Sequence, residues 1–168
     1  DIDGSMSDLK VNSISGNTST GVHIPGHVIQ TVTHAFSDNT SITTYGTTYT
    51  DITNGAITIT PKHSNSKILI MPNIVFYMTA TSTYVYGGIR LLRGSSTVVA
   101  PTNSMDGNGA YDYGYSKTTS GSAQLDLRHC GHHVDTPATT SATTYKFQGI
   151  NYASSRTMVF NGAGGSSS

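Results

Sequence analysis

The densest group of side chains that could bind a metal is the segment His129-Cys130-Gly131-His132-His133. Zinc sites use imidazole and thiolate ligands, three or four of them from the protein. In an extended strand His129 and His133 share one face while Cys130 and His132 share the other, so one chain offers at most two ligands per face. We therefore expect no cofactor. An axial metal ion held by His129 and His133 of three chains stays open beside the plainer interpretation, a polar strand end.

Side chains that could do catalysis are few. Cys130 next to a histidine could form a thiol nucleophile, but no element that would activate it is visible. The sequence contains no Glu, so glycoside hydrolysis would have to use aspartates, and none of these lies in an apolar segment. They are typical of turns and surfaces, and we expect no enzymatic activity. The aspartates concerned are Asp51, Asp106, Asp112, Asp126 and Asp135.

The best recognition candidate is a tyrosine-rich stretch inside the connection from Pro101 to Ser122. Tyrosine offers a large contact area and a hydroxyl, while Asp and Asn accept hydrogen bonds from sugar hydroxyls. We therefore predict a tentative ligand site there, and the connection is long enough to be a functional or a disordered loop. The alternative is a short strand whose tyrosines pack at a subunit interface. The site residues are Asn108, Tyr111, Asp112, Tyr113 and Tyr115.

Composition narrows the class of protein. Of the 168 residues, 26 are Thr and 22 are Ser, and only 11% are charged, with a formal net charge of zero. Thr and Tyr favour strands, whereas Gly and Ser favour turns, so the chain is predicted to be all-β. A balanced charge gives no reason to expect nucleic acid as a partner. No apolar run approaches a membrane span, so we expect no membrane insertion. The one cysteine excludes an internal disulfide.

About nine strands are expected, in an antiparallel two-sheet sandwich of jelly-roll-like type. Ile57 and Ile59 alternate with threonines, which predicts a strand with one apolar face. The run from Ile68 to Phe76 is apolar at both odd and even positions, which predicts a strand covered on both faces. Asn54-Gly55 predicts a hairpin turn, and Gly94-Ser95-Ser96 predicts another. Pro61 and Pro137 mark corners. The expected strands are 28–36, 47–52, 56–60, 67–78, 84–93, 97–100, 123–134, 143–152 and 157–160.

Four segments are expected along the chain. Residues 1–5 are interpreted as the remnant of a cloning junction, because Gly-Ser precedes Met6. Residues 6–26 are an extended attachment arm, with Leu9, Val11 and Ile14 as its contact points. Residues 27–161 form the β-sandwich, and 162–168 are a flexible Gly/Ser tail.

Several motifs in this order resemble short virion proteins of marine tailed bacteriophages, of the tail-fibre or head-fibre type. They cover nearly the whole chain from Met6. The family differs at one point, because its members continue with an apolar strand after the Ser-rich stretch. A piece missing after Ser168, or another segment at that sheet edge, is expected to account for this. The motifs are 6–14, 24–30, 57–61 with 66–70, 91–95 and 135–145.

The resemblance implies a trimeric β-sandwich that is displayed on the particle surface. Such a protein would be made in the host cytoplasm, released by lysis and attached to other virion proteins through its N-terminal arm. It would be non-enzymatic, with a cell-surface glycan as a candidate ligand. The alternative function is a stand-alone carbohydrate-binding module that uses the loop 108–115.

Overall fold

The computed structural model describes residues 28–43, 48–80, 84–99, 112–117, 123–152 and 156–162. The chain divides into two units, Asp1–Thr31 and Val32–Ser168. In the first unit the described residues, 28–31, are not in a strand. The expected arm and its contact residues Leu9, Val11 and Ile14 lie outside the described part, as do residues 1–5 and most of the tail.

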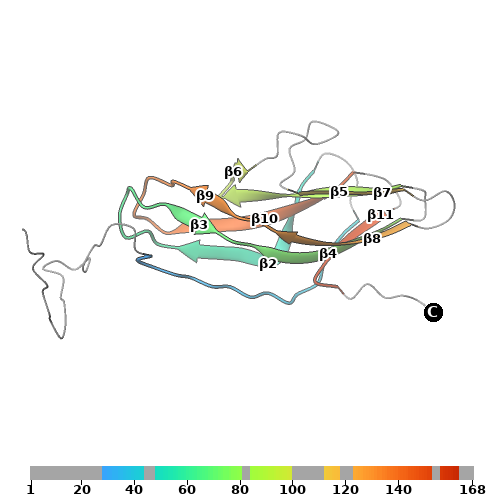
Figure 1. The fold of residues 1–168 in the computed structure, drawn as a ribbon, viewed down its shortest axis with the longest axis horizontal. Helices are drawn as coiled ribbons and strands as arrows, with labels where there is room; N and C mark the ends of the chain where they lie inside the picture. Colours follow the sequence, from blue (N-terminus) through green and yellow to red (C-terminus); the bar gives the residue numbers. More distant parts are fainter. Residues whose placement is uncertain are drawn as a thin grey trace, which may run out of the picture. The chain divides into compact units, whose positions relative to one another are not determined.

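The second unit is all-β, as predicted (Figure 1). Eleven strands occur in its described part, and every pair of neighbouring strands is antiparallel. No helix that could cross a membrane occurs among the described residues. The strands are β1 Thr40–Ile42, β2 Thr50–Ile59, β3 Ile68–Ile70, β4 Asn73–Ala80, β5 Tyr84–Arg93, β6 Ser96–Val99, β7 Asp112–Lys117, β8 Ala123–Cys130, β9 His133–Asp135, β10 Thr143–Asn151 and β11 Arg156–Phe160.

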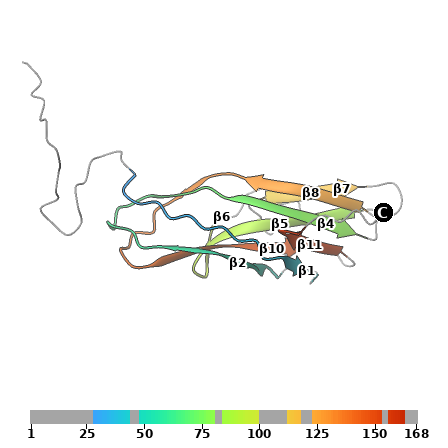
Figure 2. The same ribbon diagram turned by 90° about the horizontal axis from the view of Figure 1, so that it is seen from below.

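Two main sheets form a β-sandwich (Figures 1 and 2). The four-stranded sheet has the order β1-β11-β4-β8. The five-stranded sheet has the order β2-β10-β5-β6, and β7 also pairs with β5. A third pair, β3 and β9, continues β4 and β8 along the same two chain segments.

The core lies between the two sheets and is built from alternate positions of their strands. Phe76 and Phe160 of the four-stranded sheet pack with their ring centroids 5.3 Å apart. Across from them, a Cβ on Gly149 would lie 2.7 Å from the Phe160 ring, so the sheets approach too closely there for a side chain. The buried core residues are Ile42, Ile52, Ile74, Phe76, Met78, Ala80, Ile89, Leu91, Tyr145, Phe147, Met158 and Phe160.

Local turn chemistry explains the β5–β6 hairpin, which is confirmed. Gly94 has φ +58°, a conformation that glycine adopts without a steric cost, and Arg93 pairs with Ser96 across the two-residue turn. The corners at Pro61 and Pro137 are also confirmed. Each loop carries the chain between the five-stranded sheet and the β3–β9 pair, and both lie at the same end of the sandwich (Figure 1).

The Asn54-Gly55 hairpin prediction is wrong. Asn54 does adopt a positive φ of 54°, but β2 continues through it along the same partner strand. Residues Asp51 and Ala56 of β2 oppose Gln148 and Lys146 of β10, so the extra residues form a bulge. The left-handed conformation that the sequence signalled therefore kinks one strand and does not connect two.

Three other strand predictions need correction. No strand forms over 28–36, where the described chain is irregular, and the first strand among the described residues is β1. The run Ile68–Phe76 is interrupted at Met71-Pro72, because proline has no N–H for the ladder. It is also covered on one face only, since Ile74 and Phe76 are buried while Leu69, Met71 and Val75 are exposed. The predicted strand 123–134 breaks at the matching position, Gly131-His132.

Candidate functional site

The tyrosine-rich stretch is partly a strand. Asn108 and Tyr111 lie outside the described residues. Asp112, Tyr113 and Tyr115 belong to β7, whose backbone pairs with β5 so that Tyr115 is opposite Tyr86 and Tyr113 is opposite Gly88. The strand alternative weighed from the sequence is therefore confirmed for residues 112–117. Whether these tyrosines bind a ligand or face a neighbouring subunit stays a prediction.

The histidine cluster is divided between two strands. His129 lies on β8, is 6% exposed, and packs with its ring centroid 6.4 Å from that of Phe147. His133 lies on β9 opposite Ile70. An axial metal site would need both rings at the outer surface, and burial of His129 against a core phenylalanine argues against that arrangement. No group of three or more metal-ligating side chains occurs within the described ranges.

The candidate catalytic groups lie far from one another in the strand order or have structural partners. The exposed Cys130 has its sulfur 3.6 Å from the amide oxygen of Asn73. Asp126 accepts hydrogen bonds from Gln124, while Asp51 and Asp135 are engaged in ion pairs. Asp106 lies outside the described residues.

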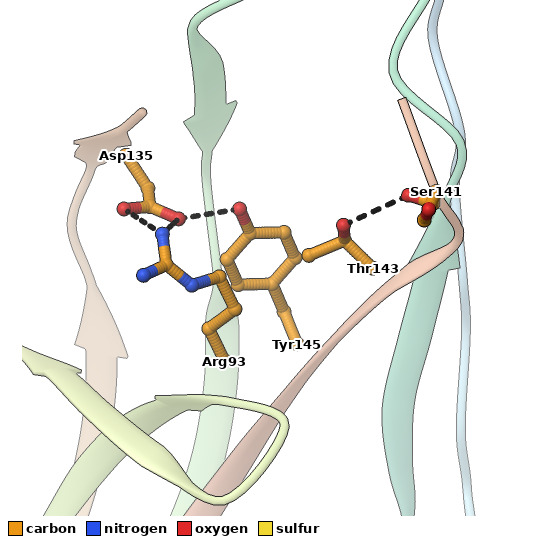
Figure 3. Close-up of polar contacts among 5 residues, drawn as sticks. All are labelled: Arg93, Asp135, Ser141, Thr143 and Tyr145. Carbon is orange, nitrogen blue, oxygen red and sulfur yellow. Dashed lines mark hydrogen bonds and ion pairs between the residues drawn. The ribbon is translucent and has the colours of Figure 1, made fainter. Parts of the chain in front are cut away.

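A partly buried polar node joins three strands at the corner end of the sandwich (Figure 3). The Arg93 Nη1 atom contacts both carboxylate oxygens of Asp135, at 2.9 and 2.8 Å. The hydroxyl of Tyr145 donates a hydrogen bond of 2.6 Å to the same carboxylate. Burial and this hydrogen bond to Asp135 raise the pKa of Tyr145 above its ordinary value of 10.0. The node holds β9 to β5 and β10.

The outer face of the five-stranded sheet carries a second polar group, the Arg90 network, formed by Tyr49, Asp51, Arg90, Lys146 and Gln148. Arg90 alternates with the buried Ile89 and Leu91, and Lys146 and Gln148 alternate with the buried Tyr145 and Phe147, so their side chains point away from the core. Hydrogen bonds from Lys146 and Gln148 lower the pKa of Asp51. The carboxylate therefore stays charged at neutral pH.

A surface of a different kind lies on the outer face of two strand pairs, β3–β9 and β4–β8. Four large apolar side chains are exposed there, which we call the apolar patch: Leu69 (57% exposed), Met71 (74%), Val75 (40%) and Val134 (51%). Leu69 and Val134 are directly opposite each other in the β3–β9 pair. Val75 lies on β4 opposite the exposed Arg128 of β8, so it does not form one continuous apolar surface with Leu69 and Val134. Isolated exposed apolar residues are ordinary, whereas groups of them are typical of surfaces that bind another molecule.

Sequence reasoning missed the Arg90 network, the node and the apolar patch. The members of each polar group come from distant segments, such as Asp51 and Lys146 or Arg93 and Asp135, and only the strand register brings them together. The apolar patch could have been found from the sequence, because Pro72 inside the apolar run signals an interrupted strand.

A scan against protein-family models and a search of curated proteins both found no match.

Proposed function

We propose that this chain is a non-enzymatic structural protein of a virion surface, of the phage-fibre or capsid-decoration type, acting as a homotrimer. The observation that carries the proposal is the apolar patch. Its four side chains are uncharged and lie on a sheet face that the described chain leaves uncovered. Copies of the same chain are the partners that best fit it, because subunit contacts are the common reason for such a face on a β-sandwich.

The sequence resemblance supports the remaining parts of the proposal. Residues 6–26, through Leu9, Val11 and Ile14, attach the protein to other virion proteins. The sandwich, in a jelly-roll-like arrangement, is the displayed platform, made in the host cytoplasm and released on lysis. No cofactor, nucleic acid or membrane insertion is required. A cell-surface glycan is a candidate ligand of the displayed protein.

A second candidate is a stand-alone carbohydrate-binding module that uses residues 108–115. The observation that favours it is β7, which places Asp112, Tyr113 and Tyr115 beside β5 at an edge of the five-stranded sheet. This module would act as a monomer and would need no covered apolar face.

Light scattering of the purified protein distinguishes the two. A particle mass of three times the 17.7 kDa chain is expected for the virion protein. A stable monomer that binds a glycan through residues 108–115 would overturn it.

Deletion of residues 6–26 is expected to abolish incorporation into particles while the sandwich stays folded, and retained incorporation would contradict the role of the arm.

A further inference from the structure

The Arg90 network brings together three of the few charged residues of this chain. Asp51 comes from β2, Arg90 from β5 and Lys146 from β10, so the network crosses three adjacent strands. Tyr49, just before β2, contributes an aromatic ring, with the Arg90 guanidinium carbon 3.9 Å from its centroid. A second pair of polar side chains extends the same strip, because the Thr58 and Thr144 hydroxyls are 2.7 Å apart across β2 and β10.

Hydrogen bonds within the network fix the orientation of its side chains. The Nε of Arg90 donates to the Gln148 amide oxygen at 2.8 Å, and the Gln148 amide nitrogen donates to one oxygen of Asp51 at 2.6 Å. Lys146 donates to the other oxygen of Asp51 at 2.7 Å. A ligand that binds here therefore meets side chains whose conformational freedom is already reduced, which lowers the entropy cost of binding.

The cations of the network keep free hydrogen-bond donors. Each Asp51 oxygen and each end of the Gln148 amide already takes part in one hydrogen bond. No hydrogen bond joins Nη1 or Nη2 of Arg90 to another described residue, and the Lys146 ammonium has further N–H groups to offer. Two cations and one anion leave a net charge of +1. A ligand that supplies acceptor atoms and a negative charge matches these free donors.

From this surplus we infer that the outer face of the five-stranded sheet binds an acidic saccharide, a glycan that carries uronic acid. The terminal amino groups of Arg90 form a planar fork that suits a carboxylate, while the Thr58–Thr144 pair offers hydroxyls to neighbouring sugar rings. From Thr144 to Gln148 the strip measures about 13 Å along β10, which suits an oligosaccharide more than a single ion. The proposal deepens the host-surface role of the proposed function and depends on it only for its biological setting.

A net charge of +1 also distinguishes this ligand from polyanions. Nucleic acids and densely sulfated glycans are held by many cations at once, and their affinity falls steeply with salt. This strip offers only two cations, whose positions are fixed by hydrogen bonds. Recognition therefore depends on the geometry of one carboxylate and its neighbouring hydroxyls.

Titration calorimetry with an alginate-derived oligouronate tests this inference. Wild-type protein is expected to bind it more tightly than a neutral mannan oligosaccharide of the same length or a sulfated one. Arg90→Lys keeps the charge but removes the fork, so we expect the affinity to fall by about tenfold or more. Arg128→Lys, an exposed position on β8 in the other sheet, is the matched control and is expected to leave the affinity unchanged.

Absence of oligouronate binding at millimolar concentration would overturn the inference. So would equal binding of the neutral sugar, a preference for the sulfated one, or an Arg90→Lys variant that binds as wild type. Thermal unfolding of both variants verifies that they are folded. A trimer mass together with any of these results would reject the saccharide site and leave the proposed structural function standing.

Discussion

The two outer faces of the sandwich differ in whether their side chains find interaction partners within the same chain. On the five-stranded sheet, the charged and amide side chains of the Arg90 network bind one another, so this face is compatible with water and with a polar ligand. On the β3–β4 and β8–β9 ladder, Leu69, Met71, Val75 and Val134 expose apolar surface to solvent. The first face is complete in a single chain, whereas the second gains free energy only when another molecule covers it.

The Arg93–Asp135–Tyr145 node connects the two regions. Asp135 is on β9, next to Val134 of the apolar patch, while Arg93 and Tyr145 belong to the five-stranded sheet. The side chains of Arg93 and Asp135 are 33% and 11% exposed, so the ion pair is partly shielded from water. The node therefore holds the strand that presents the patch at a fixed position on the sandwich.

The largest effect is expected from charges placed in the apolar patch. Leu69→Asp combined with Met71→Asp should convert the trimer to a monomer, because assembly would bury unpaired carboxylates. Light scattering measures the change. Thr58→Asp, at an exposed position on the other outer face, is the control and should remain trimeric. If the double variant remained trimeric, the apolar patch would not be the contact between subunits.

Loss of the node carboxylate should have the next largest effect. Asp135→Ala leaves Arg93 and the buried Tyr145 hydroxyl without their shared partner, and we expect the free energy of unfolding to fall by about 2–3 kcal/mol. Denaturant unfolding measures it. Asp126→Ala, an exposed aspartate on β8, should change stability by less than about 0.5 kcal/mol. Similar effects of the two substitutions would show that the node does not hold β9.

Removal of the Tyr145 hydroxyl alone should cost less, because Asp135 keeps Arg93. We expect Tyr145→Phe to lower the free energy of unfolding by about 1–2 kcal/mol. The pKa of Tyr145 is raised from its ordinary 10.0, so the folded state retains this proton more strongly than the unfolded state. Its stabilising contribution is full below pH 10 and is lost as the pH rises further. Unfolding at several alkaline pH values should show a shallower decline for Tyr145→Phe, and parallel declines would contradict this.

The smallest effect is expected in the Arg90 network. The Asp51 carboxylate is 55% exposed, so its ion pair with Lys146 is screened by water, and Asp51→Asn should cost at most about 0.5–1 kcal/mol. Because the folded-state pKa of Asp51 is lowered, its contribution is present above the ordinary value of 3.8 and lost as the pH falls below it. Acid unfolding of both proteins tests this, and an equal acid dependence would contradict it.

The sequence predicted features that depend on neighbouring residues better than features that depend on register. The all-β class, the Gly94 turn and the corners at Pro61 and Pro137 follow from local residue preferences. Asn54 adopts the conformation that its type favours, yet the chain bulges there and does not reverse, since pairing with β10 continues on both sides. Strand pairing, and not the local Asn-Gly signal, therefore determines whether the chain bulges or reverses at Asn54.

The candidate sites show the same limit. Tyrosines at 113 and 115 alternate as a strand would, and β7 forms, but the sequence does not place β7 beside β5. Asp51 and Asp135 were interpreted as turn and surface residues, and both have ion-pair partners far away in the chain. Met71 and Val75 were expected inside the sandwich because the apolar run suggested two covered faces, and one face is exposed.

The central claim is that the apolar patch is a contact between subunits, and thiol labelling tests it most directly. In a Cys130→Ser background, which removes the native exposed cysteine, Met71→Cys and Thr58→Cys each provide one thiol on opposite outer faces. The account predicts that the thiol at position 71 reacts at least about tenfold more slowly than that at 58 in the assembled protein, because interface cores exclude solvent. Equal labelling rates at the two positions would contradict it.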